Sequence, residues 1–497
     1  MLRLHQIPKA FPGGHLASED YEVQINGQPC PVHACRVSAM PFNRLWPGHQ
    51  RPLEQTELAS YISFESDGPV ELRVTPDMAF RKAIIRPRSK NTPAQIRNGV
   101  ITFNLEKTGF HVLELDDNHH ALHIFFNAPD EFPEKDTATY YFGPGIHFQN
   151  PVRLKDNDSV YVDRDAIVYG AFQGNGVKNV RIFGHGVIDG SSCERIFRTD
   201  WLNLQNGNVG FYDSQDITVD GPILMNSPTW TARFFNCRNV QLTNVKIVGQ
   251  WRYNSDGIDF CNSQNCSANH CFVRAFDDAL VIKGIPSYND VPTTDISFSD
   301  CVLWCDWGRT CEIGAETWGP EIANIRFADC DLIHNSCKAL DIQAGGPANI
   351  HDVTFENLRL EYQPYNLLEI YQETDEMAFT PRHGPLTWLC IENRRWVYEE
   401  PYAHIDGISV KDVSICFEDG TPMPKIMLFS YSGEEHPHYH LIEKKHPMKD
   451  CMPPRPQPVI FGNIILQNVT VNGTPVTDIN RFGGTRNAAA TAHLVVR

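Results

Sequence analysis

The stretch NSDGIDFCNSQNCSANHCFVRAFDDALVIKG, residues 254–284, decides the fold of this chain. It places Asp256 21 residues before Asp277 and 22 residues before Asp278. That separation is about one coil of a right-handed parallel β-helix, in which residues one coil apart stack at the strand spacing of about 4.8 Å. Carboxylates distant in sequence then converge on one face. The spacing therefore predicts both a solenoid and a candidate acid/base site.

The same unit recurs through most of the chain. Its pattern is apolar-x-apolar-x-(Asn/Asp/Gly)-apolar, with successive intervals of 35, 23, 26, 30, 29, 28, 55 and 56 residues. The last two intervals fit two coils each, or one coil with an insertion. A period of this size is typical of a solenoid, and the period-2 apolarity within each unit makes it a β-solenoid. We align the first position of the unit at Ile182, Ile217, Val240, Cys266, Ile296, Ile325, Val353, Ile408 and Ile464.

Two further positions of the unit have a physical interpretation. The fifth position holds residues that tolerate the left-handed bends between strands, namely Asn244, His270, Asp300, Asp329, Asn357, Asp412 and Asn468. The sixth position holds Val245, Cys271, Cys301, Cys330, Leu358, Val413 and Val469. Because cysteine alternates there with valine and leucine, we interpret these cysteines as small core residues.

The first part of the chain has a different pattern. Up to about residue 127 it reads as short strands with strict alternation of apolar and polar residues, as in VITFNL at 100–105. Such alternation is typical of half-buried antiparallel strands, and it predicts a β-sandwich. We therefore expect an all-β chain with a small N-terminal β-sandwich over residues 1–135, a right-handed parallel β-helix over 136–480 and a C-terminal tail over 481–497.

Two segments interrupt the repeat. Residues 387–404 and 429–458 are rich in aromatic, histidine and proline residues. We interpret both as loops that project from the coils, and loops of that length usually shape a binding mouth. They are also the candidate contacts of an oligomer.

Charge and composition exclude several classes of partner. The formal net charge is −17, which argues against nucleic acid and against an anionic membrane, since both require a basic face. The N-terminus lacks the apolar core of a secretory signal, so we expect a cytoplasmic protein, or a secreted one if a leader has been removed. The fifteen cysteines form neither a CxxC metal pair nor a compact disulfide framework. We expect no cofactor and no metal in the site.

The three aspartates match what inverting glycoside hydrolysis requires. That reaction needs one protonated carboxyl for the leaving oxygen and one ionised carboxylate to activate water, about 6.5–9.5 Å apart. Adjacent coils can supply this separation. Crowding of Asp277 and Asp278 with Asp256 is expected to raise the pKa of one of them, so that it keeps a proton near neutral pH.

Four motifs resemble those of the polygalacturonase-like glycoside hydrolases, in that family's order. They are VRIFGHGVIDG at 180–190, NSPTW at 226–230, NSDGID at 254–259 and DDALVIKG at 277–284. The resemblance implies a pectin-lyase-like β-helix and an Asp triad. Asp277 would be the general acid, Asp256 and Asp278 would hold and deprotonate the water, and Asn254 would help to set the geometry. The sandwich ahead of the helix is similar, as an architecture only, to the dextranase-type hydrolases.

The chain departs from the family at two places. Where pectin-cleaving members carry Gly-His-Gly, this chain has Gly-Arg-Thr at 308–310, so the histidine position falls on Arg309. The family's Arg-Ile-Lys, which binds a galacturonate carboxylate, falls on Asp-Ile-Gln at 341–343. An aspartate there would repel a uronate, whereas Asp341 and Gln343 could hydrogen-bond to sugar hydroxyls. These departures favour a neutral sugar.

Other side chains fall near the motif edges in successive coils, where one groove is expected. Aromatic faces stack on sugar rings and charged groups bind hydroxyls. The candidates for substrate binding beside Asn254, Asp341 and Gln343 are Trp251, Arg252, Lys283, Arg309, Glu312, Glu316, Trp318 and Tyr371.

The leading hypothesis is an inverting O-glycoside hydrolase that cleaves a neutral, α-linked oligo- or polysaccharide with Asp256, Asp277 and Asp278. One alternative is a polygalacturonase whose carboxylate site is rearranged. A second is a β-helix polysaccharide lyase or epimerase, in which Arg309 or Lys283 would serve beside a neutralised uronate. A third is a non-catalytic glycan-binding protein.

Overall fold

The structure is a computed structural model. Two short strands, β38 (Leu368–Glu369) and β39 (His383–Gly384), form an antiparallel pair apart from the main sheets. The residues that the structure describes are 1–8, 16–39, 53–130, 132–195, 207–364, 368–369, 383–384, 386–392, 403–430 and 460–497. Tyr371 and most of the segment 429–458 lie outside these ranges.

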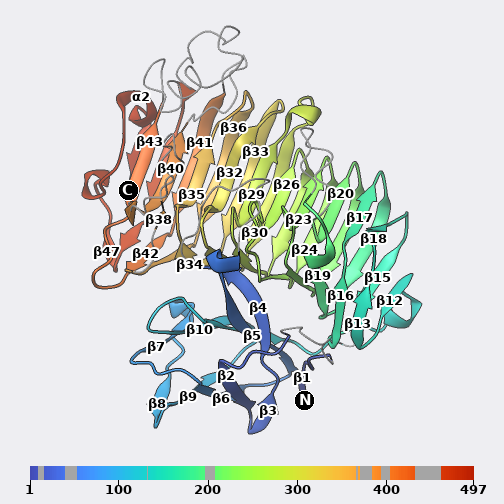
Figure 1. The fold of residues 1–497 in the computed structure, drawn as a ribbon. Coiled ribbons are helices and arrows are strands. Elements are labelled where there is room, and N and C mark those ends of the chain that lie inside the picture. The colour runs from blue at the N-terminus through green and yellow to red at the C-terminus, as the bar shows by residue number, and fades with distance from the viewer. Residues whose placement is uncertain are drawn as a thin grey trace.

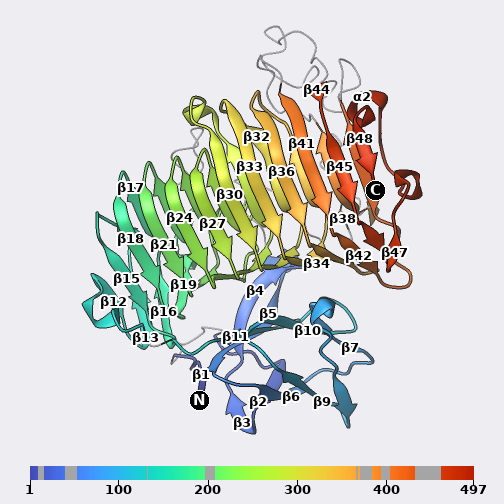
Figure 2. The same ribbon diagram turned by 180° about the vertical axis from the view of Figure 1, so that it is seen from behind.

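Three long parallel sheets form the body of the molecule (Figures 1 and 2). In the described residues, sheet 1 has 13 strands, sheet 2 has 12 and sheet 3 has 10. The chain visits the three sheets in turn, and strands pair in parallel with the strand one coil later, except that β46 and β47 at the end of sheet 2 form an antiparallel pair. The predicted all-β, right-handed parallel β-helix is confirmed.

Sheet 1 consists of β12 (Tyr140–Phe142), β15 (Ser159–Val162), β18 (Lys178–Phe183), β21 (Gln215–Asp220), β24 (Arg238–Thr243), β27 (Gln264–Asn269), β30 (Thr293–Ser299), β33 (Glu321–Ala328), β36 (Asn349–Glu356), β41 (His404–Lys411), β44 (Ile460–Phe461), β45 (Ile464–Gln467) and β48 (Leu494–Val496). Sheet 2 consists of β13 (Gly145–Phe148), β16 (Ala166–Tyr169), β19 (Val187–Asp189), β22 (Ile223–Met225), β25 (Lys246–Ile247), β28 (Phe272–Ala275), β31 (Val302–Cys305), β34 (Asp331–Asn335), β37 (Arg359–Tyr362), β42 (Ser414–Phe417), β46 (Thr470–Val471) and β47 (Thr474–Pro475).

Sheet 3 positions the candidate site. Its strands are β14 (Val152–Arg153), β17 (Phe172–Asn175), β20 (Val209–Tyr212), β23 (Ala232–Phe235), β26 (Ile258–Cys261), β29 (Leu280–Gly284), β32 (Arg309–Thr317), β35 (Lys338–Gln343), β40 (Thr387–Glu392) and β43 (Lys425–Phe429). Helical structure is minor, with α2 (Ala488–Thr491) near the C-terminus and short 3₁₀ turns such as η5 (Gly190–Ser192) and η7 (Pro286–Tyr288).

The register of sheet 1 confirms the repeat from Ile217 onward. Ile217 pairs with Val240, and the pairing continues coil by coil to Ile408 with Ile464. The first alignment was wrong by two residues, because Val180, and not Ile182, pairs with Ile217. Both residues are buried on the same side of one strand, so the pattern could not distinguish them.

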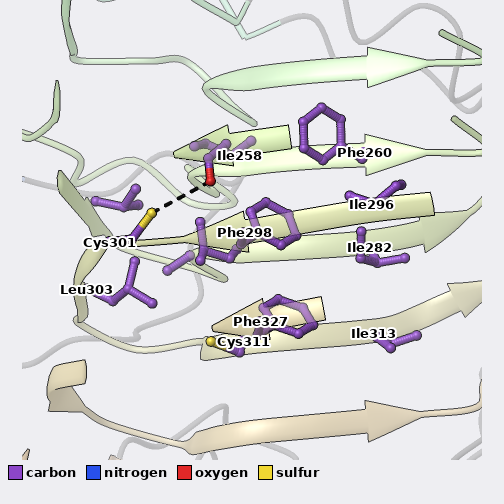
Figure 3. Close-up of a cluster of buried hydrophobic side chains, with 14 of the residues drawn as sticks. Ile258, Phe260, Ile282, Ile296, Phe298, Cys301, Leu303, Cys311, Ile313 and Phe327 are labelled. Atoms are coloured by element: carbon purple, nitrogen blue, oxygen red, sulfur yellow. Dashed lines mark hydrogen bonds between the residues drawn. The ribbon is translucent and has the colours of Figure 1, made fainter. Parts of the chain in front are cut away.

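The interior of the helix is a stack of apolar side chains, one layer per coil. Figure 3 shows Phe260, Phe298 and Phe327 in successive layers, flanked by Ile258, Ile282 and Ile313. The ring centroids of Phe260 and Phe298 are 5.5 Å apart, and those of Phe298 and Phe327 are 5.0 Å apart. Burial of each such side chain contributes about 1.5–3 kcal/mol.

The sixth position of the unit is buried in every coil, as predicted. The side chains of Cys271, Cys301 and Cys330 are at most 1% exposed, and Cys301 donates from Sγ to the carbonyl of Ser299. All fourteen described cysteines are free thiols. These cysteines therefore pack in the core beside valine and leucine.

The fifth position of the unit has a left-handed backbone, as predicted, with φ of 53°, 50°, 54°, 58°, 51°, 53° and 54° at the seven residues from Asn244 to Asn468. The side chains of this column bond from coil to coil. Asn357 Nδ2 donates to Asp329 Oδ1 at 2.7 Å, and Asn468 Nδ2 donates to Asp412 Oδ1 at 2.5 Å. A short polar side chain thus tolerates the left-handed backbone of the bend and also supplies the hydrogen bond between neighbouring coils.

A second polar ladder, which the repeat pattern did not reveal, lies at the opposite end of sheet 1. Asn265 Nδ2 donates to Asn239 Oδ1 at 2.6 Å, and Asn239 Nδ2 donates to Asp216 Oδ1 at 2.8 Å. All three residues have positive φ. Each strand of this part of the sheet is therefore bounded by left-handed residues at both ends.

The two long intervals of the repeat are single coils with insertions, because β36 pairs directly with β41 and β41 pairs directly with β45. One predicted loop is partly wrong. Residues Thr387–Glu392 form β40, a buried strand between β35 and β43. Its side chains cannot form an exposed oligomer contact. The remainder of that segment, 393–402, and residues 431–459 lie outside the described ranges.

Residues up to Asn127 form two sheets, as predicted. The outer sandwich sheet has β2 (Tyr21–Ile25), β3 (Gln28–Cys30), β6 (Val70–Pro76), β8 (Gln95–Arg97) and β9 (Val100–Leu105). The inner sandwich sheet has β1 (Leu2–Leu4), β4 (His33–Ser38), β5 (Thr56–Ser66), β7 (Ala83–Arg86), β10 (Gly109–Leu115) and β11 (Leu122–Asn127). One pairing differs from expectation, since β11 runs parallel to β5.

The inner sandwich sheet is buried on both faces because one face packs on the helix (Figure 2). Tyr61, Phe110 and Phe125 of the sandwich join Phe272 and Trp304 of sheet 2 in one apolar cluster. A buried ion pair adds to this junction. Arg86, which is fully buried, donates to Glu114 of the sandwich at 2.7 Å and also to Glu361 of the helix.

The domain boundaries at 135/136 and 480/481 remain a prediction. The first strand of the three long sheets begins at Tyr140, and the last, β48, pairs with β45 at the end of sheet 1. Within the described ranges, no helix is both long and apolar enough to cross a membrane.

The asparagine ladder makes a stability prediction. Asn357 is exposed and has φ of 51°. Asn357→Ala keeps a Cβ in the left-handed region but loses the polar side chain that tolerates this conformation, at a cost of about 1–2 kcal/mol. Asn357→Gly is the matched control, because it loses the same hydrogen bond but tolerates the backbone. We expect the alanine variant to unfold at lower denaturant concentration than the glycine variant. Equal midpoints would show that the left-handed backbone is not what selects asparagine.

Candidate active site

Asp256, Asp278 and Arg309 form a column at the edge where the strands of sheet 3 begin. The Gly257 N–H donates to the Asp278 carbonyl at 2.8 Å, and the Ala279 N–H donates to the Arg309 carbonyl at 2.8 Å. Because of these bonds, Asp256 and Asp278 occupy equivalent positions in consecutive coils, although they are 22 residues apart in the chain. The acid spacing seen in the sequence therefore equals one coil of this helix.

The Lys283 ammonium joins carboxylates of three successive coils. Its Nζ lies 3.7 Å from Asp256 Oδ2, 3.8 Å from Asp278 Oδ2 and 3.3 Å from Glu316 Oε2. It also lies 4.7 Å from the centroid of the Trp230 ring. Since Lys283 is 4% exposed, these charges interact with little screening by water.

Arg309 holds Asp278 from the opposite side. Its backbone N–H donates to Asp278 Oδ1 at 2.9 Å, and its guanidinium reaches the same oxygen at 3.4 Å. The preceding Gly308 makes this approach feasible. A Cβ at that position would lie 2.5 Å from Asp278 Oδ1 and 2.6 Å from Asp277 Oδ1. Glycine at 308 is therefore required by the two carboxylates.

Asp277 and Asp278 differ in protonation although they are neighbours in the chain. Burial, and then the charge of Asp278, raise the pKa of Asp277 to about 8. Burial alone would raise the pKa of Asp278 too, but Arg309, Glu312 and Lys283 lower it below its usual range. At neutral pH, Asp277 is thus the acid and Asp278 the carboxylate. The expected difference in pKa between Asp277 and Asp278 is present, but burial, and not the crowding of like charges, is the largest cause of the raised pKa of Asp277.

Asp256 and Glu312 complete the group of acids. Burial, followed by the charges of Asp259 and Asp277, raises the pKa of Asp256 well above its usual value. Burial and the charge of Asp278 do the same for Glu312. The site therefore concentrates its negative charge on Asp278.

Asn254, Trp251 and Arg252 lie beside these acids. Asn254 Nδ2 donates to Asp277 Oδ2 at 3.3 Å, and its Oδ1 accepts from Arg195 at 2.7 Å. Trp251 Nε1 donates to Asn226 Oδ1 at 3.0 Å. Arg252 lies over the Trp251 ring, with the guanidinium carbon 5.5 Å from its centroid. All three are half-buried, so they form part of the rim.

Asp341 and Gln343 are fully buried on β35. Lys338 Nζ lies 3.2 Å from Asp341 Oδ1 and 2.7 Å from Glu392 Oε1. Gln343 Oε1 accepts from the Arg309 guanidinium at 3.4 Å. Lys338 therefore compensates the charge of Asp341, and the expected repulsion of a uronate by Asp341 stays a prediction. Trp318 is also buried, and Tyr371 lies outside the described residues.

Sequence reasoning missed Lys338, Arg195 and Asp259. Lys338 pairs with Arg309 one coil earlier, so extending the column by one period would have found it. Asp259 lies within the NSDGID motif, and burial raises its pKa well above its usual value. Arg195 lies in a segment without the repeat, and no sequence pattern pointed to it.

Comparison with known proteins agrees with the residues assembled here. Residues 142–375 match the family model of glycosyl hydrolases family 28. The matched region contains the three aspartates, so the resemblance to the polygalacturonase-like hydrolases is confirmed. That family model describes glycoside hydrolases, which is the enzyme class predicted from the sequence.

Individual relatives are distant. The probable exopolygalacturonase B of Aspergillus terreus is 25% identical over 280 residues, which cover 50% of this chain and 62% of that protein. The protein of the same name from Neosartorya fischeri is 24% identical over 327 residues, covering 58% of this chain and 70% of that protein. The chain therefore spans less than two thirds of the length of the first of these relatives.

A solved structure shares the whole architecture. Dex49A from Penicillium minioluteum superposes with a TM-score of 0.66 at 14% identity, covering 99% of this chain and 96% of that one. At this identity the likeness shows the fold alone. It includes both the sandwich and the helix, which confirms the two-part architecture that we compared with the dextranase-type hydrolases.

The pKa of Asp277 predicts a dependence of stability on pH. Its pKa is about 8 in the folded chain and about 3.9 in an unfolded one, so folding retains a proton that the unfolded chain releases. Stability from this group is therefore lost as pH rises from about 4 to 8. Asp277→Asn removes that dependence. Its unfolding temperature, relative to the wild type, should increase from pH 4 to pH 9.

The matched control for this measurement is Asp419→Asn, whose side chain is exposed. It should follow the wild type at every pH. A difference between Asp277→Asn and the wild type that stays constant from pH 4 to pH 9 would contradict the raised pKa.

Proposed function

We propose that this chain, whose residues 142–375 match glycosyl hydrolases family 28, is an inverting O-glycoside hydrolase. The observation that carries the proposal is the unequal surroundings of two neighbouring buried aspartates, because Arg309 and Lys283 lie within 4.0 Å of Asp278, while burial raises the pKa of Asp277 to about 8. Inversion needs one carboxyl that gives a proton and one carboxylate that takes one. The site provides both at neutral pH. Asp277 and Asp278 lie closer together than the expected separation of about 6.5–9.5 Å, since one Cβ at position 308 would lie 2.6 Å and 2.5 Å from their Oδ1 atoms. Asp256, one coil away, therefore shares the task of holding the water with Asp278.

Each side chain has a role in the proposed reaction. Asp277 gives its proton to the glycosidic oxygen as the bond to the anomeric carbon breaks. A water attacks that carbon from the opposite face, and Asp278 takes the proton that the water releases. The product is a free anomeric hydroxyl of inverted configuration. Asp277 ends ionised and Asp278 protonated, and exchange with solvent resets both.

Lys283 and Asp256 position the base and the water. The Lys283 ammonium lies within 4 Å of both Asp256 and Asp278, so it fixes their separation across two coils. Asp256 Oδ1 has no hydrogen-bond partner among the described residues, although it is buried. Such an oxygen is costly to leave unsatisfied, and the attacking water would satisfy it.

We propose a neutral, α-linked oligo- or polysaccharide as the substrate. The supporting observation is the balance of charge around the acids. Lys283 and Arg309 each lie within 4.0 Å of three carboxylates, and Lys338 lies within 4.0 Å of two. Because these three cations are already paired with acids, none of them is left to bind a uronate carboxylate, while hydroxyls could still bind.

A galacturonan is the second candidate substrate. It is favoured by the relatives from Aspergillus terreus and Neosartorya fischeri, which are both named probable exopolygalacturonase B. The lyase or epimerase alternative is less favoured, because Arg309 and Lys283 are both ion-paired with carboxylates and not poised as bases. A non-catalytic glycan-binding protein is also less favoured, because binding alone does not require Asp277 and Asp278 to differ in protonation.

The remaining expectations about context stay proposals. A carbohydrate is the proposed partner, without nucleic acid or membrane. Oligomer contacts are proposed only for the parts of the two interrupting segments outside the described ranges. Buried thiols in a fold without described disulfides fit a reducing cytoplasm, and secretion after removal of a leader is the alternative. Cell fractionation distinguishes the two compartments.

Loss of either member of the pair should abolish catalysis while the fold is retained. We expect Asp277→Asn and Asp278→Asn each to lower kcat by at least about a hundredfold. Circular dichroism would check folding, and Asp419→Asn provides a control with an exposed aspartate. Proton NMR of the first product should show the inverted anomer. A retained anomer, or near-full activity in either variant, would reject the proposal.

The charge of the site should select the substrate. On a panel of neutral and uronic oligosaccharides, we expect release of reducing ends from an α-linked neutral substrate and little from oligogalacturonates. Preferred cleavage of galacturonate would replace the neutral assignment by the second candidate. Absorbance of an unsaturated uronide in the product would instead identify a lyase.

A further inference from the structure

We propose that His5, Glu65 and His185 form a binding site for a divalent transition metal, with Zn²⁺ as the ion that fits best. His5 follows β1, Glu65 lies in β5, and His185 lies in the turn between β18 and β19. The three residues thus come from the N-terminal strand, the inner sandwich sheet and the helix. The proposal is independent of the proposed hydrolase activity.

The distances among the candidate ligand atoms suit one ion. His5 Nε2 lies 3.4 Å from Glu65 Oε1, and His185 Nδ1 lies 3.1 Å from the same oxygen. One ligand atom from each of the three residues lies within 4.8 Å of the other two. Tetrahedral Zn²⁺ with bonds of about 2.0–2.1 Å places its ligand atoms about 3.3 Å apart. Two of the three distances between the candidate ligand atoms, 3.4 Å and 3.1 Å, are close to this value.

The state of His5 is the second observation that points to a ligand. The side chain is 1% exposed, and neither ring nitrogen has a hydrogen-bond partner among the described residues. Burying a polar group without a partner is costly, and native proteins rarely do so. A metal bound through Nε2 would satisfy the nitrogen that faces Glu65.

The surroundings orient the other two ligands. Arg164 donates to Glu65 Oε2 at 2.7 Å, which leaves Oε1 directed toward the two histidines. Ligating carboxylates are commonly held in this way by an outer partner. Gly221 makes room for the other histidine, since a Cβ there would lie 2.6 Å from His185 Cδ2. The ring is therefore confined against the backbone of the next coil.

The ligand set favours zinc over hard cations. Two imidazoles and one carboxylate suit Zn²⁺, whereas Mg²⁺ and Ca²⁺ prefer shells made of oxygen. Three protein ligands leave the fourth position of a tetrahedron to water. Arg164 and the buried Lys246 add positive charge nearby, so we expect weaker binding than in a site without neighbouring cations.

Metal content and cobalt substitution test the site in the full-length wild type. After chelation and dialysis, the protein should take up one equivalent of Zn²⁺ and unfold several degrees higher than the metal-free form. Co²⁺ should give the intense visible bands of a tetrahedral site. His185→Gln and His5→Gln should each abolish the cobalt spectrum and the zinc-dependent shift. His5→Gln is the milder change, because it lies next to an edge strand.

His111→Gln is the matched control. His111 is also buried, and its Nδ1 also lacks a described hydrogen-bond partner, but it lies outside the cluster. This variant should bind metal like the wild type. Wild-type protein that takes up no zinc and gives no tetrahedral cobalt spectrum would overturn the proposal. So would unchanged metal binding in both His5→Gln and His185→Gln.

Discussion

Parallel stacking of the coils in register is the constraint on which the rest of this structure depends. Backbone hydrogen bonds of sheet 3 join each strand to the strand one coil later, so a separation of 22 residues becomes a contact between neighbours. The acids of the site are brought together by this backbone register and not by a loop. A rigid scaffold of this kind holds catalytic groups more accurately than a mobile loop would.

Burial then determines how the assembled acids behave. Several carboxylates in one dry cluster cannot all be ionised, so the protein distributes a few cations among them. Lys283 and Arg309 stabilise charge on Asp278, while burial raises the pKa of Asp277 and of Asp256. The chemistry of the site therefore depends as much on the positions of two cations as on the aspartates. An identical triad with these cations elsewhere would divide its protons differently.

Much of this could be predicted from the sequence, since the determinants are local or periodic. Alternating apolar residues and a fixed polar bend reveal a coil, and the register from Ile217 to Ile464 followed from them. The failures have physical reasons. The sequence predicts a loop at Thr387–Glu392 because the neighbouring residues are irregular, although the residues of this strand themselves suit a strand. The neutralisation of Asp341 by Lys338 was missed because it depends on side chains that meet across the face of one strand.

The inner sandwich sheet is buried on both faces, and this limits how the chain can be truncated. Phe272 and Trp304 of the helix are covered by sandwich residues such as Tyr61 and Phe125. A truncated chain without the first sheets would present these apolar rings to water, and exposed patches of that kind promote association. The sandwich thus covers these apolar side chains of the solenoid and shields them from water. Shortened versions of this protein should keep that cover, or carry polar replacements on sheet 2.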